Sequence, residues 1–372
     1  MKIVTLLSRI DQTGMTTNTL DLAQGMIKDG HEVYVITGGQ VEKNNLRLDG
    51  LLQEFLDAGV VVKKFTIPHG GKVKRIFLSF TSVIKILYLI IALKPDVIHS
   101  QSPYMSFLPW LLGKKFTSTF HVNDFVKSFR YKKASHLIAI SKETKEYAIK
   151  LFDYNPKNIT IVNHGVSKEY SAAMDVKAKD DFKKKNNIPL DKIIIGFVGS
   201  IEKRKGHDVL LEAVSKLNED AKSKIHLIFL GSSKHQDNRP WLENLIDQTK
   251  TAEMVTLFEY QNPKPFYQIY DVFVLPSRLE GFPLVVIEAM MSECCVIRSN
   301  VQGAYDQIDD GKDGFIFENE NSQELTTILN NVIHNNKLRV NVAKAGKEKA
   351  LNRFTIEEMT KGTLEVYKKV KI

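Results

Sequence analysis

The sequence predicts an α/β protein made of two doubly wound domains, each built around a parallel sheet. Three observations predict this class. The chain has 372 residues, more than a single hydrophobic core usually organises. A strand, helix, strand pattern opens the chain at residues 2–37, and a second such pattern begins with IIIGFVGS at residues 193–200. Short apolar runs that alternate with helical stretches are typical of parallel sheets covered by helices.

The border between the two domains is expected in a charged segment near the middle of the chain. Residues 169–191 contain a KKKNN cluster and Pro189, a composition that suits an interdomain linker and a leading helix. We therefore expect a first domain over residues 1–168 and a second over residues 192–354.

The elements of the first domain follow from apolar periodicity. Residues 2–7 form an alternating apolar run that predicts a strand, and residues 16–29 have the apolar spacing of an amphipathic helix that Gly30 closes. Residues 32–37 (EVYVIT) predict the next strand. Further strands are expected at KPDVIHS, FTSTFHVND, ASHLIAIS and NITIV.

The second domain contains the stretch on which the functional prediction depends. The apolar run at residues 271–275 (DVFVL) is too short for a helix and predicts a buried strand. After a turn, Pro283 stands where a helix begins, and residues 284–291 continue as an apolar helix. The free amides of Leu284 and Val285 would favour an anion such as a diphosphate.

Two carboxylates flank this predicted helix start. Glu280 lies in the turn and Glu288 lies inside the helix. Ionised carboxylates accept hydrogen bonds from hydroxyls, and a nucleotide-sugar carries a diphosphate between two polyols. On spacing alone, the pattern is explained better by a surface glutamate and a helix glutamate that pairs with a lysine than by a nucleotide-sugar site.

The full string favours the nucleotide-sugar. Glu280, seven intervening residues and Glu288, with Gly281-Phe282 after the first and Ala289-Met290 after the second, resemble the signature of retaining glycosyltransferases of the GT-B fold. This large group includes sucrose synthases and many bacterial surface-polysaccharide transferases. The resemblance implies two Rossmann-like domains facing a cleft, with a C-terminal helix (residues 355–372) that crosses back to the first domain.

The resemblance also implies roles for individual side chains. Glu280 would bind donor-sugar hydroxyls, Glu288 the ribose, and Lys205 the diphosphate. His121, at the end of a short strand, would contact the sugar beside the reacting carbon, with Asp124 either orienting it or capping a helix. These assignments make His121, Glu280 and Lys205 the predicted catalytic residues.

The remaining donor contacts implied by the resemblance include two departures from the family pattern. Ser200 stands where the family has an arginine, so Arg204 or Lys203 would have to supply that charge, although a KRK turn by itself is usually a solvated basic turn. Pro283 replaces a glycine of many relatives and cannot donate a hydrogen bond. The other predicted contacts of the nucleotide-sugar are Gly14, Gly231, Phe282, Leu284 and Val285.

Charge is distributed unevenly along the chain. The first 170 residues hold 23 Lys and Arg against 14 Asp and Glu, whereas the remainder holds 29 of each. A basic face indicates an anionic partner such as a membrane surface or an acidic substrate, while a lysine-rich surface kept for solubility explains it equally well. No recognition motif for nucleic acid accompanies the charge, so no nucleic-acid partner is expected.

Residues 72–93 form a long apolar segment with basic residues at Lys72, Lys74, Arg75 and Lys85. A transmembrane span is not expected, because Lys85 falls within the segment. A buried helix of the first domain is the plainer interpretation. The alternative is an amphipathic helix that lies on anionic lipid. The two interpretations are compatible if one face of the helix packs on the sheet while its basic N-terminal end meets lipid.

The composition predicts a cytoplasmic protein, placed peripherally on the inner face of the membrane if the lipid interpretation holds. Cys294 and Cys295 are adjacent and are not expected to form a disulfide, and the start of the chain opens directly into a strand pattern rather than a signal peptide. No Asp-x-Asp pair occurs, so we expect no metal site and no cofactor, the nucleotide-sugar being a co-substrate.

The predicted function is retaining transfer of a hexosyl unit from a nucleoside diphosphate sugar, with UDP as the expected carrier, to a glycan or lipid-linked acceptor. Two alternatives stay open. One is a sugar-nucleotide epimerase on the same fold. The other is a non-catalytic partner of a transferase, for which the missing arginine at Ser200 leaves room.

Overall fold

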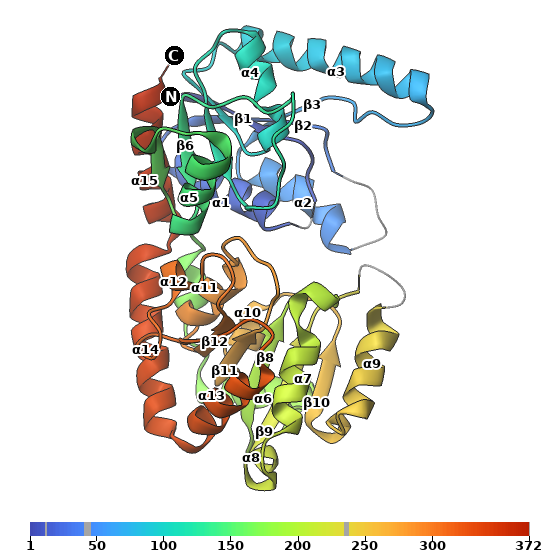
Figure 1. The fold of residues 1–372 in the computed structure, drawn as a ribbon, viewed down its shortest axis with the longest axis vertical. Helices are drawn as coiled ribbons and strands as arrows, with labels where there is room; N and C mark the ends of the chain where they lie inside the picture. Colours follow the sequence, from blue (N-terminus) through green and yellow to red (C-terminus); the bar gives the residue numbers. More distant parts are fainter. Residues whose placement is uncertain (12, 41–45, 234–237, 372) are drawn as a thin grey trace. The chain divides into compact units, whose positions relative to one another are not determined.

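A computed structural model describes residues 1–11, 13–40, 46–233 and 238–371 and divides the chain into two compact units (Figure 1). Unit 1 contains Met1–Gly165 together with Ile356–Ile372, and unit 2 contains Val166–Thr355. Each unit is built on one parallel sheet with helices packed around it, which confirms the predicted α/β class.

Unit 1 holds a seven-stranded sheet in the order β3-β2-β1-β4-β5-β6-β7, and every neighbouring pair is parallel. Its strands are β1 (Lys2–Leu7), β2 (Glu32–Thr37), β3 (Val61–Lys64), β4 (Val97–Ser100), β5 (Thr117–Phe120), β6 (His136–Ala139) and β7 (Ile159–Ile161). Its α-helices are α1 (Gly14–Lys28), α2 (Leu46–Asp57), α3 (Lys72–Leu93), α4 (Phe107–Leu111), α5 (Lys142–Phe152) and α15 (Ile356–Val370).

The C-terminal helix belongs to unit 1, as predicted. α15 packs along α1 so closely that a Cβ on Gly25 would lie 2.1 Å from the hydroxyl oxygen of Thr360. The buried Tyr367 hydroxyl is 2.7 Å from Nδ1 of His99 on β4. Since Met359, Val366, Tyr367 and Val370 of α15 are buried in the core of this unit, the fold of unit 1 depends on this helix.

Unit 2 holds a six-stranded parallel sheet in the order β10-β9-β8-β11-β12-β13. Its strands are β8 (Ile193–Val198), β9 (Ile225–Leu230), β10 (Val255–Phe258), β11 (Val272–Leu275), β12 (Cys295–Ser299) and β13 (Phe315–Phe317). Its α-helices are α6 (Val176–Lys185), α7 (His207–Ser215), α8 (Glu219–Ser223), α9 (Asn238–Gln248), α10 (Lys264–Tyr267), α11 (Leu284–Met291), α12 (Ala304–Gln307), α13 (Ser322–His334) and α14 (Asn336–Arg353).

The segment expected to be a linker lies within unit 2 in the structure. Residues 169–191 contain α6, whose Phe182 packs edge-on against Phe266 at 5.1 Å between ring centroids. Because this charged stretch contributes an aromatic ring to the packing of unit 2, it is part of that unit rather than a free connection. Cys294 and Cys295 are both buried free thiols.

The helix α3 differs from the prediction of a buried element. Its bounds agree with the predicted segment, but Ser82, Ile86 and Ile90 are its only buried residues among the 22, all of which the structure describes. By length and composition alone α3 is apolar enough to cross a membrane, a property shared by core helices of soluble proteins. Val83, Leu87, Leu89 and Leu93 are partly buried against the same core, and most of the other apolar side chains of the helix are exposed.

Candidate functional site

The predicted donor site forms where β8 and β11 of unit 2 end. Two loops leave the carboxyl edge of the sheet there: one leads from Gly199 to a 3₁₀ turn at Lys203–Lys205, and the other contains Glu280. The ammonium of Lys205 donates a hydrogen bond to Oε1 of Glu280 at 2.7 Å. Ligands of open α/β sheets bind at this edge, so the structure brings two predicted catalytic residues together in a suitable place.

Gly206 allows the two loops to approach each other. It lies in the left-handed region (φ 73°), and a Cβ there would lie 1.9 Å from the carbonyl oxygen of Pro276. The amide of Arg278 donates to the carbonyl oxygen of Arg204 at 2.8 Å, which joins the loops directly. Only glycine fits this crossing.

We expect Gly206→Ala to destabilise the protein by at least about 2 kcal/mol, because left-handed strain and a backbone overlap add together. Gly14→Ala is the matched control, because a Cβ at Gly14 would have no neighbouring atom within 4 Å and its φ is ordinary. Urea unfolding at neutral pH measures both. Equal stability of the two variants would show that the loops do not meet at Gly206 in solution.

Arg278 fixes the basic loop, a role that the sequence did not predict. Its guanidinium donates two hydrogen bonds to Asp208 in the first turn of α7, at 2.9 and 2.8 Å, and one to Glu320 at 2.7 Å. It also donates to the carbonyl oxygen of Lys203 at 2.6 Å. The hydrogen bond to Asp208, partly offset by desolvation, raises the pKa of Arg278. A charge held by four hydrogen bonds gives the turn before α7 a fixed shape.

Glu280 is ionised although it is nearly buried. Burial would raise the pKa of its carboxyl, but the charges of Lys205 and Arg204 and the hydrogen bond from Lys205 outweigh burial and lower it. Its side chain is 10% exposed. A buried carboxylate beside a cation is an acceptor for hydroxyl groups and cannot act as an acid at neutral pH.

Arg204 lies in the same cluster, where it could supply the charge that Ser200 lacks. Its guanidinium is 3.8 Å from Oε1 of Glu280 and donates to the carbonyl oxygen of Leu279 at 2.8 Å. It also donates to Glu202 at 2.8 Å, and the hydroxyl of Ser200 donates to that same carboxylate oxygen at 2.6 Å. Part of the Arg204 charge is therefore balanced by Glu202.

The second acidic residue of the motif is buried in α11. Glu288 is 9% exposed, and Oε2 accepts a hydrogen bond from the hydroxyl of Tyr267 at 2.8 Å. Burial raises the pKa of Tyr267, and the charge of Glu288 raises it further, so the phenol keeps its proton and donates it. Tyr267 thus orients Glu288, a contact that the sequence did not predict.

At the start of α11, the groups available to bind an anion are backbone amides rather than side chains. The N-cap is Pro283, and the first amides of a helix have no intrahelical acceptor. The ring of Phe282 is buried edge-on against Phe354 at 5.7 Å, so that ring packs in the core instead of facing a ligand. Leu284 is buried and Val285 is half-buried, which leaves their amides as the groups able to bind an anion.

The two predicted glycine contacts have different surroundings. Gly231, directly after β9, approaches the residue that follows β8 so closely that a Cβ would lie 1.8 Å from the carbonyl oxygen of Gly199. This crossing alone requires glycine there. Gly14 begins α1 of unit 1 beside open space, and its predicted role near a diphosphate stays a prediction.

His121 belongs to a polar network at the carboxyl edge of the sheet of unit 1. Its Nε2 is 2.7 Å from Oε1 of Gln101, and its Nδ1 is 3.2 Å from Nε2 of His164. The amide oxygen of Gln101 can only accept a hydrogen bond, so Nε2 of His121 carries the proton. Nδ1 of His121 is then unprotonated and is the acceptor in its contact with His164. Gln101 and His164 orient the ring, a role for which Asp124 was one of two expected possibilities. Burial lowers the pKa of His121, and the neighbouring imidazoles lower it further, so the ring is neutral at pH 7.

Two buried histidines should make the fold sensitive to acid. Burial lowers the pKa of His99 in unit 1 and of His207 in unit 2 to about 3, against 6.5 for an exposed imidazole. Between pH 6.5 and 3 the unfolded chain binds more protons, so stability falls as pH falls through this window. We expect each of the two histidines to lower the free energy of unfolding by about 2 kcal/mol between pH 7 and pH 5.

His207→Leu is the test, because the ring packs against Phe197 at 4.3 Å between centroids and a leucine suits that apolar contact. The difference in unfolding free energy between pH 7 and pH 5 should shrink in this variant. An unchanged difference would mean that His207 is not buried in solution.

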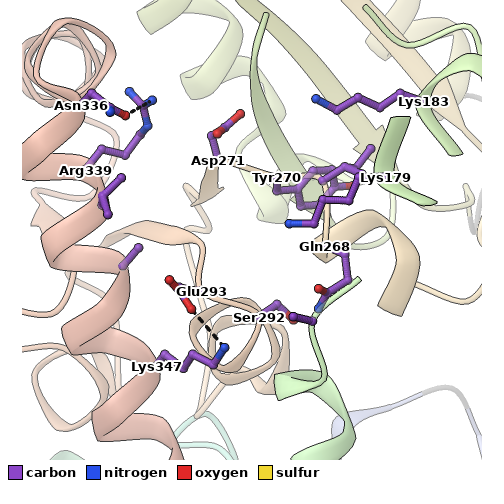
Figure 2. Close-up of a pocket in the computed structure, with 14 residues that line it drawn as sticks. Lys179, Lys183, Gln268, Tyr270, Asp271, Ser292, Glu293, Asn336, Arg339 and Lys347 are labelled. Carbon is purple, nitrogen blue, oxygen red and sulfur yellow. Dashed lines mark hydrogen bonds and ion pairs between the residues drawn. The ribbon is translucent and has the colours of Figure 1, made fainter. Parts of the chain in front are cut away.

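A cavity of about 430 Å³ lies elsewhere in unit 2 (Figure 2). It is lined by Asp271 and Glu293, which precede β11 and β12, and by Lys179 of α6 and Arg339 of α14. These positions place it at the amino edge of the sheet, opposite the edge that carries Lys205 and Glu280. The hydrogen bonds and ion pairs around Glu280 locate the predicted donor site better than this cavity does.

Two protein-family models match the chain. The model described as glycosyl transferases group 1 matches residues 178–349, and the model described as Glycosyltransferase Family 4 matches residues 13–170. An uncharacterized glycosyltransferase of Methanocaldococcus jannaschii is 23% identical, over 95% of this chain and 94% of its own. The capsular polysaccharide biosynthesis glycosyltransferase CapM of Staphylococcus aureus is 27% identical, over 78% of this chain and 81% of its own.

Solved structures show the same fold. A glycosyltransferase from Rickettsia africae has a TM-score of 0.85 with 21% identity, covering 99% of this chain and 98% of its own. HepE of Anabaena in complex with UDP has a TM-score of 0.83 with 16% identity, covering 99% and 100%. The two family matches cover most of both units, and the chain belongs to the group 1 glycosyltransferases of the GT-B fold.

Proposed function

We propose that this glycosyltransferase moves a hexosyl unit from a UDP-linked sugar to a glycan or lipid-linked acceptor, with retention of anomeric configuration. The observation that supports it best is the contact of Lys205 with Glu280 beside the start of α11. That arrangement combines a cation and free amides for a diphosphate with an ionised acceptor for sugar hydroxyls.

The chemistry asks for positive charge where the diphosphate leaves. Lys205 has three N–H donors, so it can keep its hydrogen bond to Glu280 and still donate to a phosphate oxygen. Arg204 adds a second cation within the same cluster. Together with the amides of α11 they would stabilise the leaving group as its charge grows, and the proposal therefore needs no metal and no other cofactor.

The sugar would be held by polar side chains rather than attacked by one. Glu280 would accept from its hydroxyls, Glu288, oriented by Tyr267, from the ribose, and the neutral ring of His121 would contact the sugar near the reacting carbon. In a retaining reaction of this family, the departing diphosphate takes the proton of the acceptor hydroxyl on the same face of the sugar.

Relatives support the choice of donor and acceptor. HepE of Anabaena has been solved with UDP and with UDP-glucose, and a 30% identical protein of Campylobacter jejuni is named as a transferase acting on a diphospho-undecaprenol-linked sugar. The latter match covers 62% of this chain and 59% of that protein. We therefore propose a role in polysaccharide or glycolipid assembly at the cytoplasmic face of a membrane. The comparisons favour neither an epimerase nor a non-catalytic partner.

A panel of nucleotide-sugars tests the proposal. We expect UDP-sugars to raise the melting temperature of the full chain, and one of them to be consumed when a glycan or lipid-linked acceptor is supplied. Proton NMR of the first product should show the anomeric configuration of the donor. Turnover without an acceptor would indicate epimerisation or hydrolysis, and no response to any nucleotide-sugar would indicate a non-catalytic subunit.

A further inference from the structure

The helix α3 exposes a continuous apolar stripe. Seven large apolar side chains along it are each between 51% and 83% exposed. At about 100° per residue, their spacing places all of them on one side of the helix, within roughly 120° of its circumference. The stripe consists of Val73, Ile76, Phe77, Phe80, Ile84, Tyr88 and Ile91.

The opposite side of α3 anchors the helix to unit 1. Ile86 and Ile90 are buried in a core cluster with Met105 and Leu108, next to and within α4. The hydroxyl of Ser82 donates to the carbonyl oxygen of Thr66 at 2.6 Å. The N-terminal part of α3 projects past the edge of the sheet (Figure 1). The stripe is therefore presented outward by a helix that is held in place on its other side.

The charges around the stripe have one sign. The sequence has no acidic residue between Asp57 and Asp96, whereas α3 carries Lys72, Lys74, Arg75 and Lys85. Lys74 and Lys85 both lie on the same flank of the stripe, about 100–120° around the helix from its centre. An apolar stripe edged by lysines complements a surface that is apolar below and anionic above, which describes a bilayer of acidic lipids.

The neighbouring helix α4 extends this surface. Trp110 and Leu111 are half-exposed, and α4 packs directly against α3. The ammonium of Lys132 lies 4.3 Å from the centroid of the Trp110 ring. An amphipathic aromatic ring beside a lysine is typical of the interface between lipid headgroups and acyl chains.

Two other occupants fit less well. A second copy of the chain would bring two basic helices together with no acidic residue on either to balance them. A membrane-spanning α3 would have to pull Ile86 and Ile90 out of the core of unit 1. A helix lying in the plane of the membrane needs neither change.

We propose that α3 is a docking helix that lies in the interface of an anionic bilayer. Phe77, Phe80 and Ile84 enter the acyl boundary, while Lys74 and Lys85 extend their ammonium groups to lipid phosphates. The use of this docking, bringing the enzyme to a lipid-linked acceptor, rests on the proposed function. The docking itself depends on no residue of the donor site.

Vesicle flotation with the full chain tests the docking. The wild type should float with vesicles of phosphatidylglycerol and phosphatidylcholine, and salt should weaken the binding because it screens the lysines. A triple variant, Phe77→Gln with Phe80→Gln and Ile84→Gln, should bind at least ten-fold more weakly. The matched control, Leu151→Gln with Val176→Gln, replaces apolar residues on α5 and α6 that are at least half exposed as well, and it should bind normally.

The charges have their own test. Lys74→Gln with Lys85→Gln should lower affinity for the anionic vesicles several-fold and reduce the salt dependence, while Lys28→Gln with Lys150→Gln, on other surfaces of unit 1, should not. Melting curves and circular dichroism confirm that each variant is folded.

Two results would overturn the docking proposal. One is wild-type protein that stays unbound at low salt. The other is wild-type protein that sediments as a dimer, with the triple variant a monomer, which would assign the stripe to a second copy. If vesicles bind but no nucleotide-sugar does, the docking helix stands and the proposed function fails. If nucleotide-sugars bind but vesicles do not, the proposed function stands and the docking proposal fails.

Discussion

Lys205→Ala is expected to lower kcat with a UDP-sugar at least about 100-fold, because it removes a preorganised cation from the leaving diphosphate. The Lys205 side chain is 14% exposed and its ammonium pairs with Glu280 at 2.7 Å, so little water can replace the ammonium when it is removed. Arg204 stays in the variant and should keep some activity. Lys205→Arg should recover part of the rate, since it restores charge but not the position of a single ammonium.

Lys216→Ala is the matched control for this prediction. Lys216 follows α7 in the same unit and pairs with Glu212 at 2.8 Å, so its removal also breaks a lysine–glutamate pair, but at a more exposed position. Its kcat should stay within two-fold of wild type. Comparable kcat values for the Lys205 and Lys216 variants would remove Lys205 from the mechanism.

Glu280→Ala is expected to lower kcat with a UDP-sugar about 100-fold, while UDP alone binds as tightly as before or more tightly. The two effects separate because Glu280 has two possible partners. It would accept hydroxyls of the sugar, and it also pairs with Lys205, whose charge the variant frees for the phosphates. Isothermal titration with UDP and steady-state kinetics with the UDP-sugar measure the two quantities.

A purely structural role for Glu280 would give a different result. Removing one partner of a nearly buried pair costs stability, about 3 kcal/mol or more, so folding must be checked by circular dichroism at the assay temperature. If Glu280→Ala weakens UDP and the UDP-sugar equally, or if Glu280→Gln is fully active, Glu280 supports the loop and does not bind the sugar. Glu212→Gln, on the exposed face of α7, serves as the control.

Local pattern was enough to predict the elements around the site. The short apolar run at residues 271–275 became β11, and the segment after Pro283 became α11. Both predictions depend on neighbours in sequence: a run too short for a helix, and a proline at a helix start. The same is true of β1, which spans the predicted residues 2–7.

Contacts between distant residues could not be predicted in this way. Arg278 holds Asp208, 70 residues earlier, and Tyr267 orients Glu288 from a separate helix. Asp124 was expected either to orient His121 or to cap a helix, and the hydrogen-bond partners of the His121 ring are Gln101 and His164. Strands β4, β5 and β7 deliver these three side chains to one edge of the sheet, and only the topology shows that.

The helix α3 shows a second limit of pattern analysis. A segment that is apolar on nearly every side is usually buried, so burial was the plainer expectation for residues 72–93. The core of unit 1 buries Ile86 and Ile90 and partly covers Val83, Leu87, Leu89 and Leu93, but it leaves the opposite side of α3 exposed. Whether the apolar side chains of α3 are buried or exposed therefore depends on how much surface the rest of unit 1 offers to the helix. The sequence of the helix does not give that surface.

A crystal structure of the full chain with an unhydrolysed UDP-sugar would show directly whether the donor binds at Lys205 and Glu280. We expect diphosphate density within hydrogen-bond distance of the Lys205 ammonium and of the amides of Leu284 or Val285. We also expect sugar hydroxyls on Glu280 and ribose hydroxyls on Glu288. Donor density at another edge of unit 2, or a bound sugar that leaves Glu280 and Glu288 without a contact, would contradict this placement of the donor.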